Sequence, residues 1–332
     1  MSGSILVYVV GDRIGDAVIK LPVIAALRAS FPRHRITWLA GRRASAFAGP
    51  LAPLVAGLID EVRDRAGIGV SLAELLRRPP LRERFDIVID TQSRLATTIL
   101  LRRLAHGVFI SPCAGFLLSD RRPAPGAIRP RSVRGAFLQL VELAAGRALP
   151  IDPVIRIDDG YRRAAAELLP PGPQYLGLAP GAGGARKRWP LENFIGIAQT
   201  QAAAGRVPVW FLGPDEVCLL DKLRAAVPQS SFPEQAASGA MQRGPLLAIA
   251  LAGRLRAALS NDSGTGHLLA AAGIPTLTLF GHTDPAKFAG DAPNRSAILA
   301  ADHGAADVAA IPVPAVAAAL EAILARVPEA VA

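Results

Sequence analysis

Short runs of β-branched and aromatic residues alternate along this chain with longer Ala- and Leu-rich amphipathic stretches. That alternation predicts parallel sheets covered by helices, an α/β architecture. It occurs twice, before and after a crossing segment at 147–160, so the 332 residues divide into domains at 1–155 and 156–332. We expect two Rossmann-like doubly wound domains facing an interdomain cleft, where such folds usually bind a ligand. The last helix could pack back on the first domain.

The expected elements follow from the same periodicities. In the first half we predict strands at 5–10, 35–39, 55–60, 85–90 and 107–110, helices at 16–30, 93–104 and 132–146, and a mobile loop at 111–131. In the second half we predict strands at 175–179, 207–212, 255–259 and 276–280, and helices at 191–204, 215–226, 245–252, 264–272 and 313–326.

Charge is distributed unevenly between the halves. The net charge is +10, and residues 1–165 carry 25 Lys and Arg against 14 Asp and Glu. This excess indicates a polyanionic partner, although 33 of the 37 basic residues are Arg, which also fits a plain compositional bias. Two distant cysteines and the lack of a long apolar run favour a cytoplasmic protein that meets a membrane only at its surface.

The first motif, Gly11-Asp12-Arg13-Ile14-Gly15-Asp16, follows the first predicted strand and opens a helix. Its glycines permit a close approach of backbone to ligand, but its two carboxylates would repel a pyrophosphate. A hydroxylated substrate suits this turn better. Asp16 is available there as a general base, with a reference pKa of about 3.9; alternatively it only favours the helix N-terminus.

The second motif runs from Pro180-Gly181 to Lys187-Arg188-Trp189-Pro190, where a strand leads into a glycine-rich loop with three cations. Backbone N–H groups, cationic side chains and a following helix N-terminus would together form an anion cradle. The alternative is a solvated basic loop.

The third motif is Ser260-Asn261-Asp262-Ser263-Gly264-Thr265-Gly266-His267, again between a strand and a helix. Its hydroxyls, glycines and free N–H groups suit phosphates, whereas Asp262 most simply caps the helix. Glu216, after another strand, could bind ribose hydroxyls or merely begin a helix. The chain has no Asp-x-Asp, HExxH or His-x-His pattern, so we expect no metal and no cofactor.

Taken together, these segments resemble glycosyltransferase family 9, the ADP-heptose:lipopolysaccharide heptosyltransferases of the GT-B fold. The resemblance rests on Ile14-Gly15-Asp16, Phe85 to Gln92, Pro180-Gly181 with Lys187-Arg188-Trp189-Pro190, Asn261 to Gly264 with His267, and Phe280 to Pro285. It implies an inverting, metal-independent transfer with Asp16 as base. It also implies that Lys187 neutralises the diphosphate and that Ser263, Gly264 and His267 hold it. The donor would contact Gly181, Arg188, Glu216 and Asp262, and the acceptor would contact Gly15, Asp90 and Gln92.

The leading hypothesis is heptose transfer from an ADP-sugar to the lipopolysaccharide inner core, an anionic glycolipid, at the inner face of the cytoplasmic membrane. Another nucleotide sugar or glycan acceptor within the family remains open. Two other classes also remain: a nucleotide-sugar epimerase of the same fold, and a non-catalytic polyanion-binding protein. Nucleic acid is not expected as a partner, because only 5% of residues are aromatic and offer stacking platforms.

Overall fold

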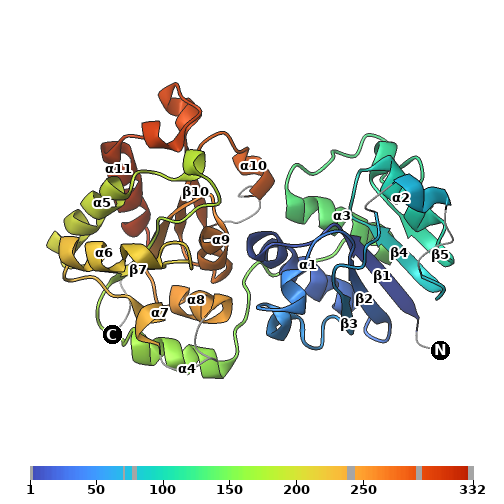
Figure 1. Ribbon diagram of the computed structural model, residues 1–332, viewed down its shortest axis with the longest axis horizontal. Coiled ribbons are helices and arrows are strands. Elements are labelled where there is room, and N and C mark those ends of the chain that lie inside the picture. The colour runs from blue at the N-terminus through green and yellow to red at the C-terminus, as the bar shows by residue number, and fades with distance from the viewer. Residues whose placement is uncertain (1–2, 70–71, 77–80, 238–243, 289–293, 328–332) are drawn as a thin grey trace. The chain divides into compact units, whose positions relative to one another are not determined.

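The computed structural model describes residues 3–69, 72–76, 81–237, 244–288 and 294–327. The chain forms two compact units, Met1–Asp152 and Pro153–Ala332. The boundary lies three residues before the one predicted from sequence. Each unit contains a parallel five-stranded sheet (Figure 1), so the predicted α/β fold with two doubly wound domains is confirmed.

The sheet of the first unit has the strand order β3-β2-β1-β4-β5, with every pair parallel. β1 lies at its centre and is almost wholly buried, as its apolar run from Ile5 to Val9 requires for a strand covered on both faces. The strands are β1 (Ser4–Val9), β2 (Arg35–Ala40), β3 (Glu61–Arg63), β4 (Phe85–Asp90) and β5 (His106–Ile110).

Helices cover both faces of this sheet. α1 and α3 pack against each other, while α2 packs on β4 and contributes to a core cluster around Leu6, Val88 and Phe109. α3 begins at Ser132, whose hydroxyl accepts from Gly135 N, and ends at the left-handed Gly146. The helices are α1 (Ile14–Ser30), α2 (Leu95–Arg102) and α3 (Val133–Ala145).

The sheet of the second unit has the order β10-β9-β8-β6-β7, also parallel throughout. Its edge strand β10 was not predicted, because Arg295-Ser-Ala-Ile-Leu contains a single β-branched residue. The strands are β6 (Tyr175–Ala179), β7 (Val207–Trp210), β8 (Ala257–Asn261), β9 (Thr276–Phe280) and β10 (Arg295–Leu299).

Two helical layers enclose this second sheet (Figure 1). α4, α8 and α9 pack on one another, whereas α5 packs with α6 and α11 over the main core. α4 was not predicted; it begins at the end of the expected crossing segment and extends eight residues beyond it. The helices are α4 (Asp159–Leu168), α5 (Leu191–Ala203), α6 (Leu220–Ala226), α7 (Pro233–Ala236), α8 (Pro245–Ala252), α9 (Gly264–Ala271), α10 (Pro285–Phe288) and α11 (Val313–Leu324).

Three predicted elements need correction. The strand expected at 55–60 is wrong: a 3-10 turn occupies Ala52–Val55, Gly57 has a φ of +76°, and the strand begins only at Glu61. The strand expected at 255–259 runs two residues later, because Leu255 N still bonds Ala252 O at the end of α8. The helix expected at 215–226 is split into a 3-10 turn, Val217–Leu219, and α6.

The 111–131 stretch is irregular, as expected, but its first half is anchored. Asp120 accepts from Phe109 N at 2.7 Å and from Arg102 at 2.8 Å, and Phe116 is buried. These hydrogen bonds and the burial of Phe116 fix the first half of the segment on the sheet, which composition alone did not reveal.

Both sheets reverse their winding direction beside a central strand. In the first unit the reversal falls between β1 and β4, and in the second between β6 and β8. In open parallel sheets, ligands bind beyond the carboxyl ends of the strands at this position. The sequence motifs at Gly11–Asp16, Thr91–Gln92, Gly181–Lys187 and Asp262–His267 follow these four strands.

Candidate functional site

The turn after β1 needs glycine at position 11. Gly11 has a φ of +152°, and a Cβ there would lie 2.5 Å from the Arg43 Cβ and 2.8 Å from the Ala44 carbonyl oxygen. Asp12 N also donates to Ala44 O at 3.0 Å. Glycine therefore lets the segment after β2 lie directly against the segment after β1, which brings Arg43 to the predicted acceptor turn.

Asp16 lies in the first turn of α1 and lines a hollow of about 230 Å³ with Arg13, Arg43 and Asp12. Its side chain is half-buried, and within the described part of the first unit it makes no hydrogen bond or ion pair. The helix begins at Arg13, which provides no side-chain cap, so the first N–H groups face this region uncapped. The hollow thus combines an unpaired carboxylate with two arginines; sequence reasoning had not singled out Arg13 or Arg43.

Protein donors enclose Asp90 at the end of β4. It is fully buried, and its oxygens accept from Thr98 Oγ1 at 2.6 Å, Ser111 Oγ at 2.9 Å and Gln92 N at 2.8 Å. Burial raises the pKa of Asp90 to about 6. Asp90 thus fixes the turn that presents Gln92, and its predicted contact with the acceptor stays a prediction. Gln92 is half-buried beside Thr91, and Gly15 is buried within α1.

In the second unit, one side chain fastens both ends of the glycine-rich loop. Asn261 is fully buried; its Nδ2 donates to Pro180 O at 2.7 Å, and its Oδ1 accepts from Trp189 N at 3.1 Å. Gly281 assists from the next turn, since a Cβ there would lie 3.1 Å from Arg186 O. The cationic loop is therefore held against the end of β8.

Lys187, in the glycine-rich loop, forms an ion pair with Asp262 of the third motif. Its Nζ donates to Asp262 Oδ2 at 2.6 Å, and the side chains are 28% and 5% exposed. Ser263 caps α9, because its hydroxyl accepts from Gly266 N at 3.1 Å. The expectation that Asp262 caps this helix is therefore wrong; Asp262 instead pairs with the lysine predicted to meet the diphosphate.

His267 lies behind this ion pair. It is 7% exposed, its Nε2 is 3.9 Å from Asp262 Oδ1, and Arg295 NH1 lies 3.1 Å from its Nδ1. A guanidinium only donates, so Nδ1 accepts and the proton of the neutral ring is on Nε2. Burial, followed by the charge of Arg295, lowers the pKa of His267 well below its usual value. His267 is therefore a neutral donor, and the unpredicted strand β10 supplies the residue that fixes its tautomer.

The remaining predicted donor residues lie around the same loop. The Glu216 carboxylate packs so closely on Gly181 and Gly213 that a Cβ at either glycine would come within 2.7 Å of it. Arg188 is exposed and donates from Nε to Ala182 O at 3.0 Å. The structure therefore gathers Gly181, Lys187, Asp262, Ser263, Gly264 and His267 at one sheet edge, with Glu216 on its border.

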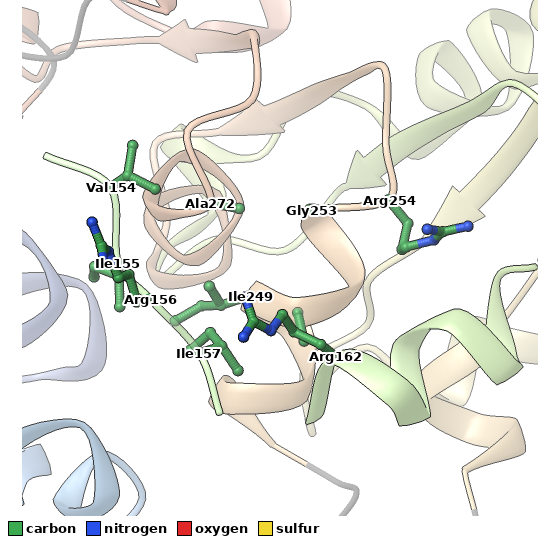
Figure 2. Close-up of a pocket in the computed structure, with 10 residues that line it drawn as sticks. Val154, Ile155, Arg156, Ile157, Arg162, Ile249, Gly253, Arg254 and Ala272 are labelled. Carbon is green, nitrogen blue, oxygen red and sulfur yellow. The ribbon is translucent and has the colours of Figure 1, made fainter. Parts of the chain in front are cut away.

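The second unit has a hollow of about 340 Å³ that lies away from these motifs (Figure 2). Ile249 and Arg162 line it, while Arg254 turns outward and donates to Leu169 O at 3.1 Å. No predicted site residue borders it. Within the described ranges, three or more potential metal-ligating side chains do not gather anywhere, and no helix is both long and apolar enough to cross a membrane.

Comparison with known proteins bears on both units. A heptosyltransferase of Pseudomonas aeruginosa, lipopolysaccharide heptosyltransferase 1, is 28% identical over an alignment of 225 residues, and the match covers 60% of this chain. The match covers 56% of that relative, so this chain aligns with little more than half of its length.

Solved structures share the fold over nearly the whole chain. A glycosyltransferase family 9 protein from Veillonella parvula has a TM-score of 0.68 at 20% identity, covering 98% of this chain and 99% of its own. An E. coli heptosyltransferase solved with ADP has a TM-score of 0.66 at 18% identity, with the same coverage. The model of glycosyltransferase family 9 (heptosyltransferase) matches residues 75–310, well over half of the chain. The chain therefore belongs to glycosyltransferase family 9, the heptosyltransferase family.

Proposed function

We propose that this protein is an inverting glycosyltransferase that moves heptose from ADP-heptose to a lipopolysaccharide core sugar without a metal ion. The supporting observation is the sheet edge where Lys187, the capped N-terminus of α9 and His267 converge. These groups supply cationic and hydrogen-bonding stabilisation for a departing diphosphate. A cation fixed by the protein takes the part that a bound metal plays elsewhere.

In the proposed reaction the acceptor hydroxyl oxygen attacks the anomeric carbon as the bond to the diphosphate breaks. The hydroxyl proton passes to the carboxylate of Asp16, and the negative charge leaves on the diphosphate beside Lys187. General-base assistance of this kind contributes roughly 10²–10⁴ in rate. A single displacement inverts the anomeric configuration. Asp16 suits the base role because it is half-buried and unpaired within the described first unit.

The donor contacts form the second part of the proposal. Gly181 and Arg188 would face the diphosphate, and Asp262 would orient Lys187 toward it. Glu216 has no hydrogen-bonded side-chain partner among the described residues, and its position over two glycines suits ribose hydroxyls. A methyl group at position 181 would displace the Glu216 carboxylate, so Gly181→Ala should weaken nucleoside binding.

The charges around Asp16 indicate what kind of acceptor would bind there. Arg13 and Arg43 line the hollow of Asp16, in the half of the chain with the basic excess. We infer an acceptor that carries a carboxylate or phosphate near the reacting hydroxyl, with Gly15 and Gln92 on its path. Contact with an anionic membrane surface, on the cytoplasmic side, belongs to this proposal.

The decisive experiment combines a nucleotide panel with a transfer assay. ADP, UDP, GDP and CMP are compared by thermal shift on wild type, Asp16→Asn and Lys187→Ala, and heptose transfer from ADP-heptose to a deacylated core acceptor is measured on all three. We expect stabilisation by ADP, retained in Asp16→Asn and lost in Lys187→Ala, with transfer lost in both.

Other results would redirect the assignment. Stabilisation by UDP or GDP alone would change the donor, and turnover of the nucleotide sugar without any acceptor would favour an epimerase. Wild-type transfer by Asp16→Asn would remove that residue as base. Arg186→Ala is the matched control for Lys187→Ala, since it removes an exposed cation next to it.

A further inference from the structure

A buried ion pair lies beside Asp16 on the first unit. Asp12 is 3% exposed and Lys20 is 9% exposed, and Lys20 Nζ donates to Asp12 Oδ1. Asp12 Oδ2 accepts two further hydrogen bonds, from Trp38 Nε1 at 2.9 Å and Ser45 Oγ at 3.2 Å. Three donors thus bond this carboxylate, one at Oδ1 and two at Oδ2, and its charge is neutralised by the lysine.

The lysine reaches Asp12 along the face that carries Asp16. Asp16 and Lys20 are four residues apart on α1, the spacing at which an acid and a base normally pair on a helix. Helical side chains lean toward the helix N-terminus, so Lys20 extends past Asp16 toward Asp12. Of the ion pairs within 4.0 Å in the described first unit, Lys20 belongs to one with Asp12 and to none with Asp16.

We propose that Asp12 is a positioning residue that holds the Lys20 ammonium away from Asp16 and so leaves Asp16 open to the acceptor hydroxyl. The inference rests on the proposed role of Asp16 as base. It goes beyond that role because it assigns Asp12 and Lys20 opposite effects: the carboxylate protects the reaction, and the ammonium, once released, inhibits it.

The physical argument is a competition between two carboxylates for one ammonium. Asp12 binds the ammonium in preference to Asp16 because Trp38 and Ser45 already orient Asp12 in a buried site, where a charge-assisted hydrogen bond is stronger than at a surface. An ammonium bonded to Asp16 would occupy the oxygen that must receive the hydroxyl proton. The charged groups facing Asp16 are Arg13 and Arg43, which line its hollow, together with the Asp12–Lys20 pair.

The test is a double-mutant cycle on the full-length protein. Asp12→Asn keeps the side-chain shape but removes the charge that holds Lys20, and we expect kcat for transfer to fall at least about tenfold as the general base becomes occupied. KM for the sugar donor should stay within about twofold, because the donor groups are untouched. Adding Lys20→Met should restore kcat to within about fivefold of wild type, since the released ammonium is gone.

Asp60→Asn is the matched control. Asp60 also pairs with an arginine of α1, Arg28, and accepts from Ile36 N at 2.7 Å, but it does not line the hollow. Its transfer rate should remain within about twofold of wild type. The melting temperature of each variant is measured as well. If Asp12→Asn melts early, the double variant alone provides the test, because the double variant replaces a buried ion pair by neutral groups.

Wild-type kcat in Asp12→Asn, or a folded double variant no more active than Asp12→Asn, would overturn the inference. A folded but inactive double variant would overturn it equally, because it would show that the ammonium or the charged pair is itself required. These outcomes differ from failure of the proposed function, in which Asp16→Asn transfers normally or wild type transfers nothing.

Discussion

Each unit pairs a lysine with a buried aspartate next to its switch point, but the two pairs differ in how far the lysine is exposed. The Lys20 side chain is 11% exposed and Asp12 is fully enclosed, whereas Lys187 is 28% exposed over an Asp262 that is 5% exposed. The aspartates also differ in their other partners. Asp12 is held by the neutral donors Trp38 and Ser45, while Asp262 has His267 at 3.9 Å.

The difference shows what burial does to the same two residue types. A lysine enclosed on its aspartate can only stabilise the fold and keep its charge from neighbours, as proposed for Lys20. A lysine that stays partly exposed keeps donor capacity for a second anion, because an ammonium has three N–H groups and the pair uses one. The contrast supports the proposal that Lys187 is the ligand-facing cation, a difference that residue type alone does not indicate.

The largest effect should come from neutralising the enclosed lysine. Lys20→Met leaves the Asp12 charge buried without its cation, so we expect the free energy of unfolding to fall by about 3–5 kcal/mol. Lys187→Met should cost about 1–2 kcal/mol, because the lysine that is lost is partly exposed and water already weakens its ion pair. Urea unfolding of both variants, followed by fluorescence and circular dichroism, measures the difference. Equal losses of stability would show that the exposure of the lysine does not decide its contribution.

The next effect concerns transfer rather than stability. Lys187→Ala should lower kcat/KM for the sugar donor by roughly 10²–10³, because it removes the cation proposed to stabilise the leaving diphosphate. Arg186→Ala, which removes an exposed cation one residue away, should change kcat/KM by less than about threefold. Steady-state kinetics with varied ADP-sugar distinguishes them, and similar losses would mean that only net charge matters.

Asp90 is a third buried aspartate, and unlike Asp12 and Asp262 it is bonded only to uncharged groups. Its pKa of about 6 in the folded protein lies above the ordinary value, so protonation favours the folded state as the pH falls through 6. Asp90→Asn removes this gain and mispairs one hydroxyl, which should cost about 1–2 kcal/mol at pH 7.5.

The deficit of Asp90→Asn relative to wild type should then widen between pH 7.5 and pH 5. Chemical denaturation at both pH values provides the measurement. A deficit that narrows on acidification would contradict a raised pKa at this site. The sign is opposite to that of a salt-bridged aspartate, whose stabilising effect is lost as the pH falls.

The smallest effect should be the pH dependence of pyrophosphate binding. Because burial and Arg295 hold the pKa of His267 low, the ring stays neutral and gains no cationic attraction between pH 8 and pH 6. ADP-ribose is a suitable probe, since both phosphates are diesters that do not titrate in this range. We expect its dissociation constant, by calorimetry, to change less than about twofold. A tenfold gain at pH 6 would show that His267 becomes charged.

Much of the fold could be predicted from local pattern. β4, β6, α8 and β9 begin and end where the periodicities indicated, because parallel strands and buried helices have strongly apolar sequences. β10 and the start of β3 could not be predicted, since both are short edge strands rich in charged or small residues whose conformation depends on a neighbouring strand.

The candidate site shows the same division. Motif position placed Lys187, Ser263 and His267 at one edge, because residues after neighbouring parallel strands converge. Pattern could not show that Asp262 pairs with Lys187 across 75 residues, or that Arg295 reaches His267. Pattern also could not show that Asp90 is fully buried, because a polar residue ending a strand looks the same whether it faces solvent or lies beneath a turn.

The double anchorage by Asn261 has a consequence for the thermodynamics of nucleotide binding. With Pro180 and Trp189 tied to one amide, the intervening loop is a closed ring whose ends are already fixed before a ligand arrives. Ordering a free segment would cost about 1–2 kcal/mol per residue in backbone entropy. A ring joined in advance has given up much of that freedom during folding. Association should therefore be fast and close to rigid, with amide hydrogen exchange in the loop nearly unchanged by the nucleotide.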